Sequence, residues 1–184
     1  MPLRKLCTVA FIAASLAGAS ALADDRANKR TEIRKVAQQS LQDFYKVEPK
    51  LKEEVAKAPG YAVFSSYGFS LIFGGAGGKG LAHDNKARSN AYMNMAQASV
   101  GVQIGASDTR YLFVFDTAKD LQRFIDTGWE AGAGGGAGAG ASKGTVGGSA
   151  GGFTGGKMYM LTKTGLQAGG AVAGTKFWKD KELN

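Results

Sequence analysis

Apolar residues between positions 25 and 46 recur at the spacing of an amphipathic helix. Its apolar side comprises Ile33, Val36, Ala37, Leu41, Phe44 and Tyr45. Three basic residues, Arg26, Lys29 and Arg30, precede Ile33 by seven, four and three positions, so they extend the same side toward the N-terminus. One side of the predicted helix is thus basic at its start and apolar further on. Its first turns could extend beyond the core, or they could lie on an anionic surface. A frayed terminus, with the helix beginning near Thr31, is the alternative.

A second, short helix is predicted at about 49–58. Pro49 suits its first turn, Leu51 and Val55 face inward, and Gly60 is expected to stop it.

From Tyr61 onward the pattern changes to short aromatic or β-branched runs separated by turn residues, which is typical of strands. The predicted strands are 61–67, 69–73, 91–95, 100–105, 111–115, 157–162 and 168–174. Turns are expected at 83–86 and at Thr164-Gly165, and a capping box of Thr117 and Asp120 opens one more helix at 118–125. This order predicts an α+β fold in which N-terminal helices pack on a glycine-rich antiparallel sheet or barrel-like structure, with one inserted helix.

Glycine alternates with other residues, mostly alanine, from Gly132 to Gly140, and glycine pairs follow at 147–148, 151–152 and 155–156. A period of two predicts a strand with one bare face, inside a single domain. A disordered linker is the alternative interpretation. An uncharged strand of small residues at 131–142 could also form an edge for self-association.

The first residues are typical of a secretory signal peptide. Basic Arg4 and Lys5 precede an apolar run that ends in Ala21-Leu22-Ala23, a small-x-small cleavage site. We therefore expect a signal peptide at 1–23, a single domain at 24–184, and an exported protein of the periplasm, with some peripheral attachment to a membrane. The lone cysteine, Cys7, lies in the signal peptide, so the mature chain would have no thiol or disulfide.

Positive charge is in excess. The net charge is +8, and loss of Arg4 and Lys5 with the signal peptide would leave +6. Such an excess favours anionic partners, although a contribution to solubility alone is the competing explanation.

No motif predicts catalysis or a cofactor. The glycines of G-A-G-G-K-G (residues 75–80) match a dinucleotide fingerprint, but no helix follows to hold a phosphate, and the Walker spacing fails. The lone histidine, His83, is expected in a solvated loop, and there is neither a second histidine nor a mature cysteine for a zinc site. We therefore expect no enzyme activity, metal or cofactor, and no nucleotide or nucleic-acid partner.

The C-terminal sequence K-F-W-K-D-K places Phe177 and Trp178 beside Lys179. Aromatic residues between lysines fit a membrane interface. The alternative is a strand end that plugs the core with Trp178.

Five sequence blocks together resemble the SYLF family of lipid-binding domains across nearly all of the mature chain. They are A-K-A-P-G-Y-A-V-F (56–64), G-F-S-L-I-F-G-G-A-G-G-K-G (68–80), S-V-G-V-Q-I-G-A (99–106), Y-L-F-V-F with its L-Q-R-F helix, and Y-M-L-T-K-T-G-L-Q-A-G-G (159–170). The resemblance implies glycine-rich β-structure packed with helices, and binding to anionic phospholipids through a basic N-terminal region. The matching residues here are Arg26, Lys29, Arg30, Arg34 and Lys35.

The sequence thus predicts a non-enzymatic envelope protein that binds anionic phospholipid surfaces peripherally. The basic residues at 26–35 would supply attraction, and Phe177, Trp178 and Lys179 would add interfacial contacts. Two alternatives stay open: a self-assembling envelope protein that uses its Gly/Ala strand, and a binder of acidic polysaccharide.

Overall fold

The computed structural model describes residues 7–66, 76–97, 109–130, 153–162, 165–168 and 175–184, and for residues 7–23 it gives only the course of the backbone. The helices are α1 (Cys7–Val47), α2 (Lys50–Lys57) and α3 (Ala118–Thr127). The strands are β1 (Gly60–Ser65), β2 (Ala76–Asp84), β3 (Ser89–Gln97), β4 (Arg110–Phe115), β5 (Trp129–Glu130), β6 (Gly156–Thr162), β7 (Gly165–Ala168) and β8 (Thr175–Lys179).

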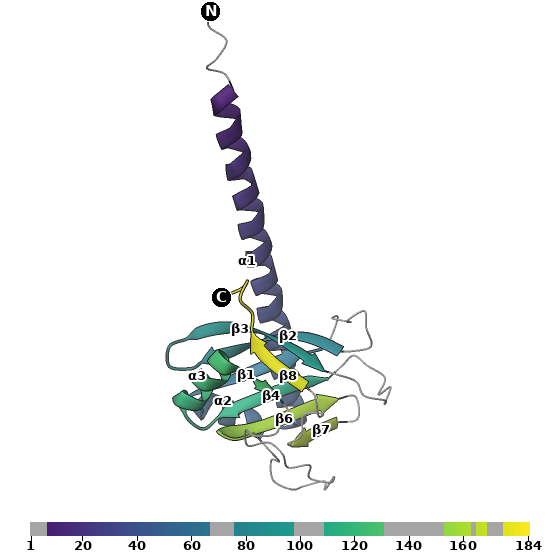
Figure 1. The fold of residues 1–184 in the computed structure, drawn as a ribbon. Coiled ribbons are helices and arrows are strands. Elements are labelled where there is room, and N and C mark those ends of the chain that lie inside the picture. The colour runs from purple at the N-terminus through teal and green to yellow at the C-terminus, as the bar shows by residue number, and fades with distance from the viewer. Residues whose placement is uncertain (1–6, 67–75, 98–108, 131–152, 163–164, 169–174) are drawn as a thin grey trace, which may run out of the picture.

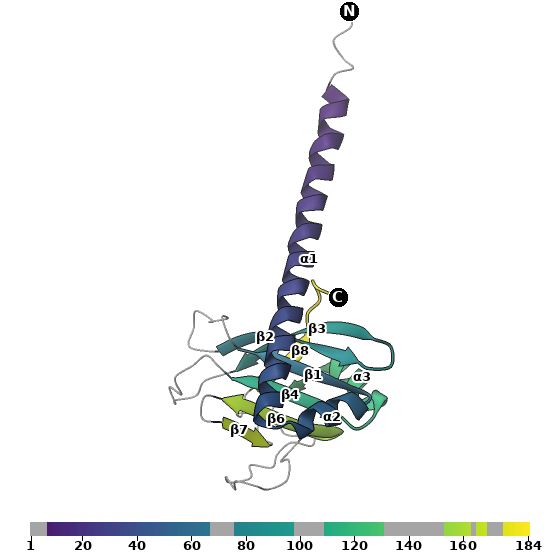
Figure 2. The same cartoon turned by 180° about the vertical axis from the view of Figure 1, so that it is seen from behind.

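The strands form one antiparallel sheet that curls into a half-barrel (Figure 1). Their order across the sheet is β5-β8-β3-β2-β1-β4-β6-β7. Helix α3 lies on one face of this sheet, and α1 and α2 lie on the other (Figure 2). The predicted α+β class, with N-terminal helices on an antiparallel sheet and one inserted helix, is confirmed.

The face that carries α1 and α2, here called the α1 face, buries the predicted apolar side of the first helix. Ile33, Ala37, Leu41 and Phe44 are all buried there. They pack with Leu51 and Val55 of α2, with Leu183 after β8, and with alternate residues of the central strands: Val63, Leu81, Tyr92, Leu112, Val114 and Leu161. The inward positions of Leu51 and Val55 were therefore predicted correctly.

The opposite face, the α3 face, is dominated by aromatic rings and methionines. Phe113 contacts the rings of Phe64, Phe124 and Phe177, with centroids 5.0–6.0 Å apart. Most of these pairs are tilted or edge-to-face, the arrangement that the ring quadrupole favours. Because strand side chains alternate, β1 and β4 supply both faces and hold the two cores back to back.

A glycine lets β2 approach β1 closely at the centre of the sheet. A Cβ atom on Gly80 would lie 2.1 Å from the carbonyl oxygen of Val63 and 2.5 Å from the ring of Phe64. The motif at 75–80 therefore belongs, over its described residues, to a strand and not to a phosphate-binding loop.

Helix boundaries differ from the predictions in two places. Helix α1 is continuous from Cys7, so it does not begin near Thr31. Helix α2 ends at Lys57, before Gly60, because Ala58 precedes a proline and adopts an extended conformation with ψ 153°. Gly60 is instead the first residue of β1.

The other local predictions can be compared where the structure describes them. Thr117 caps α3 by accepting a hydrogen bond from the Asp120 amide at 3.1 Å, as predicted. The turn between β2 and β3 occupies 85–88, two residues later than expected. Gly165 is the first residue of β7, and Thr164 of the other predicted turn lies outside the described residues.

Several predictions lie outside the described residues: the strands at 69–73 and 100–105, the Gly/Ala strand at 131–142, and most of the strand at 168–174. Within the described residues, no helix has both the length and the hydropathy that crossing a membrane requires.

Candidate functional site

Helix α1 extends well beyond the sheet, and its basic residues lie where it leaves the domain (Figure 1). Arg26, Lys29, Arg34 and Lys35 are exposed. They lie within about two and a half turns of one rigid helix, so four cations are held close together along its axis, and at about 100° per residue they point to different sides of it.

Two of these cations have local partners that keep them at the surface. Lys29 Nζ lies 2.7 Å from Asp25 Oδ2, one helical turn earlier. Arg34 Nη2 donates to Thr31 Oγ1 at 3.1 Å. The hydrogen bond and charge of Asp25 raise the pKa of Lys29, so this side chain stays charged at neutral pH.

Arg30 differs from its neighbours because it is half-buried and faces the domain. Its Nε donates to the carbonyl oxygen of Leu183 at 2.8 Å. Its guanidinium carbon lies 5.6 Å from the ring centroid of Tyr92, a cation–π contact. The predicted site is therefore divided: four of its helical cations point outward, and Arg30 joins α1 to the sheet and to the segment after β8.

That segment, residues 180–184, is here called the clasp, because it lies against both the sheet and α1 (Figure 2). Asp180, only 5% exposed, organises it. Its Oδ1 accepts from the amides of Glu182 at 3.0 Å and Leu183 at 3.2 Å, and its Oδ2 accepts from Lys79 Nζ at 2.9 Å. Burial alone would raise the pKa of Asp180, but Lys79 and the two amides outweigh burial and lower it.

At the end of the clasp, the Asn184 side chain hydrogen-bonds to the β3 backbone as a neighbouring strand would. Asn184 Oδ1 accepts from the Tyr92 amide at 2.9 Å, and its Nδ2 donates to the Tyr92 carbonyl oxygen at 2.8 Å. Between Asp180 and Asn184, Leu183 is 2% exposed and packs in the core of the α1 face. The clasp is thus fixed by both polar contacts and apolar burial.

The predicted aromatic pair of β8 is split between two environments. Phe177 is 0% exposed and lies in the core of the α3 face, so its predicted contact with lipid is wrong for this structure. Trp178 points to the α1 face and is 37% exposed. Phe177, rather than Trp178, therefore plugs the core.

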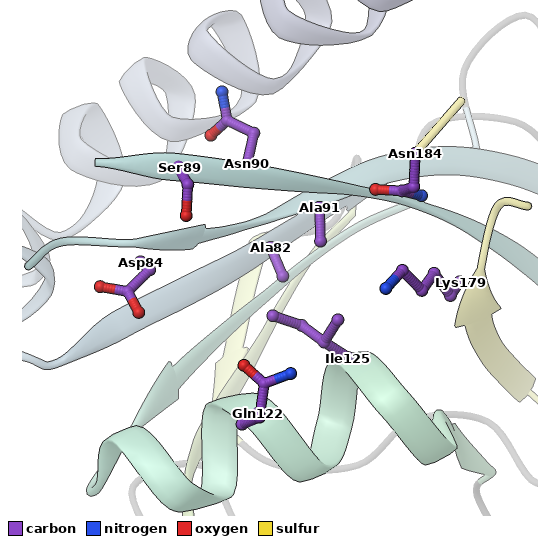
Figure 3. A pocket seen from close by; sticks show the side chains of 9 residues that line it. All are labelled: Ala82, Asp84, Ser89, Asn90, Ala91, Gln122, Ile125, Lys179 and Asn184. Atoms are coloured by element: carbon purple, nitrogen blue, oxygen red, sulfur yellow. The ribbon is translucent and has the colours of Figure 1, made fainter. Parts of the chain in front are cut away.

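Lys179 is exposed and lines a shallow polar groove of about 230 Å³ between the β2–β3 hairpin, α3 and the clasp (Figure 3). The other lining residues are Ala82, Asp84, Ser89, Asn90, Ala91, Gln122, Ile125 and Asn184. Several polar groups that line the groove already have hydrogen-bond partners. Asp84 Oδ1 accepts from the backbone amides of Lys86 and Ala87, and the Asn184 side-chain amide donates to the Tyr92 carbonyl oxygen.

His83 lies in strand β2 and not in a solvated loop. Its Nδ1 is 2.7 Å from Asn90 Oδ1, and its ring centroid lies 5.2 Å from that of Tyr61. Among the described side chains, no group of three or more histidine, cysteine, aspartate or glutamate residues could hold a metal ion.

Sequence reasoning missed the clasp, Lys79 and Tyr92. One signal was present, since Leu183 is a single apolar residue in an otherwise polar segment of the chain. The pairing of Arg30 with a backbone carbonyl some 150 positions later had no sequence signal, because side-chain type does not specify such a contact.

No protein-family model matches the chain. The chain is similar to Beta cell expansion factor A of Aeromonas veronii, with 30% identity over 154 residues. The matched region covers 84% of this chain but 58% of that protein, so the chain spans less than two thirds of the relative's length.

Proposed function

We propose that this chain is an exported, non-enzymatic protein of the cell envelope that binds anionic phospholipid surfaces peripherally. In this proposal the exposed cations of α1 make the primary contact, and Trp178 adds an interfacial anchor on the same face of the sheet.

The observation that carries the proposal is the clustering of four exposed cations where α1 leaves the domain. Each basic residue near an anionic leaflet contributes about 1 kcal/mol of attraction, so four give reversible rather than permanent attachment. The exposed Asp24, Asp25 and Glu32 on the same helix reduce this attraction, and Asp25 is paired with Lys29. Because these residues are exposed, salt should weaken the attraction strongly.

The sequence blocks that resemble the SYLF family support the same function. Where they are described, residues 76–80 lie in β2, 111–115 in β4 and 159–162 in β6, so they build the sheet against which α1 packs. The name of the Aeromonas relative refers to no lipid, so the proposal depends on the surface of this chain and on that resemblance.

Vesicle co-sedimentation of residues 24–184 tests the proposal. We expect binding to vesicles that contain phosphatidylglycerol, loss of binding to pure phosphatidylcholine vesicles, and loss at high salt. Equal binding to both vesicles, or no binding to either, would contradict it. Heparin serves as an acidic-polymer control, and preference for heparin over anionic vesicles would favour the polysaccharide alternative.

A further inference from the structure

We infer that the clasp, residues 180–184, is an intramolecular competitor for the lipid-binding face of α1 and that anionic headgroups displace it. This inference rests on the proposed function and adds its regulation: the clasp occupies part of the cationic surface until a membrane replaces it.

The first contact that supports the inference is the one between Arg30 and Leu183. The Leu183 carbonyl oxygen accepts from Arg30 Nε at 2.8 Å, in the way that a phosphate oxygen would. Arg30 lies one residue from Lys29 and one turn before Arg34, so its release would add a fifth cation to the four already exposed.

The second contact is electrostatic. The carboxylates of Glu182 and Asp180 lie close enough to add to the effect of Asp25 in raising the pKa of Lys29. The clasp therefore contacts the basic helix through one carbonyl oxygen, and the charges of Glu182 and Asp180 act on the helix only from a longer distance.

A defined set of contacts holds the clasp, and exchange with headgroups must replace them. The Asp180 amide donates to the Tyr92 carbonyl oxygen at 3.0 Å, the side chains of Asp180 and Asn184 bind Lys79 and Tyr92, and Leu183 is buried. Glu182 is exposed, so its contribution is mainly charge.

Two substitutions should strengthen vesicle binding, each compared with a matched control. Glu182→Gln should tighten binding to phosphatidylglycerol vesicles about threefold to fivefold, because one competing charge is removed beside the basic helix. Glu53→Gln makes the same charge change on α2, at the far end of the domain from the clasp (Figure 2), and should change binding less than about twofold.

Asn184→Ala should also tighten binding, without any change of charge, because it removes the two hydrogen bonds to Tyr92. Asn85→Ala is its control, since Asn85 Nδ2 likewise donates to two backbone carbonyls, those of Val55 and Ala58, each at 2.8 Å. This control loses similar bonds away from the clasp and should leave binding unchanged.

Arginine labelling with phenylglyoxal gives a lipid-independent measurement. Arg30 should react more slowly than Arg34 in the unmodified chain, and Asn184→Ala should speed the labelling of Arg30 alone. Equal labelling of both arginines in the unmodified chain would overturn the inference, even if the clasp variants bound vesicles more tightly.

The vesicle results separate the two proposals. If the unmodified chain binds anionic vesicles but each clasp variant matches its control, the clasp is not a competitor and the proposed function stands. If neither the unmodified chain nor any variant binds, the proposed function fails and the inference fails with it.

Discussion

At the scale of single residues, chemically similar side chains have different roles because of their surroundings. Arg30 and Arg34 lie one helical turn apart, yet Arg30 contacts Leu183 and Tyr92 while Arg34 points to solvent. The sequence identified both as basic residues of one helix. It could not distinguish them, because the contacts of Arg30 come from distant parts of the chain.

Gly80 allows β2 to lie close to β1, because there is no room for a side chain at this position. We predict that Gly80→Ala lowers the free energy of unfolding by about 1–3 kcal/mol, because the added Cβ would overlap the Val63 carbonyl oxygen and the ring of Phe64. Urea denaturation followed by circular dichroism measures the change. Unaltered stability would show that β1 and β2 do not lie this close together.

Asp180 predicts a specific dependence of stability on pH. Its pKa in the folded state is below its ordinary value of 3.8, so its stabilising effect is complete above that value and is lost as the pH falls through the folded-state pKa. Asp180→Asn should therefore be less stable than the unmodified chain at neutral pH, and the difference should narrow in acid.

Thermal unfolding between about pH 6 and about pH 2 tests this dependence. Asp126→Asn, an exposed change on α3, is the control and should show no comparable loss at neutral pH. A difference for Asp180→Asn that stays constant down to the lowest pH would contradict the account.

At the scale of elements, helices were easier to predict than the orientation of strands. The apolar spacing from Ile33 to Phe44 fixed which side of α1 is buried, and Thr117 marked the start of α3. No strand was predicted at the position of β8, where a strand end with Trp178 in the core was only an alternative. A one-residue shift exchanges the two faces, so Phe177 and Trp178 could not be told apart from sequence.

One prediction at this scale concerns the link between β6 and α2. Tyr159 Oη donates to both carboxylate oxygens of Glu54 at 3.0 Å, and the half-buried hydroxyl has a raised pKa, first from burial and then from this carboxylate. Tyr159→Phe should reduce the free energy of unfolding by about 1–2 kcal/mol, because a hydrogen bond to a charged group is lost.

Lys157→Gln is the matched control, since Lys157 Nζ contacts the same carboxylate at 3.1 Å but is largely exposed. That change should cost less than about 0.5 kcal/mol in chemical denaturation. Equal losses for the two variants would mean that the tyrosine hydroxyl does not tie β6 to α2.

At the scale of the whole molecule, the sheet separates two cores and leaves α1 projecting from one face. The sequence predicted this α+β plan because helical and strand periodicities occupy separate parts of the chain. It did not predict the clasp, whose hydrogen bonds join residues 30, 79, 92 and 180–184 across the fold. Such contacts depend on the folded topology and leave no periodic pattern.

The central claim is that the exposed cations of α1 make the contact with anionic lipid. It is tested by changing Arg26, Lys29, Arg34 and Lys35 to glutamine together, while Arg30 is kept because it ties α1 to the domain. The control changes four exposed lysines elsewhere, Lys50, Lys52, Lys86 and Lys119, so both variants lose the same net charge.

The decisive measurement is the partition coefficient of each variant on phosphatidylglycerol vesicles at low salt. Because each cation contributes about 1 kcal/mol near an anionic leaflet, the α1 variant should bind at least tenfold more weakly than the unmodified chain. The control should lose much less. Equal losses in both variants, or full binding by the α1 variant, would contradict the account.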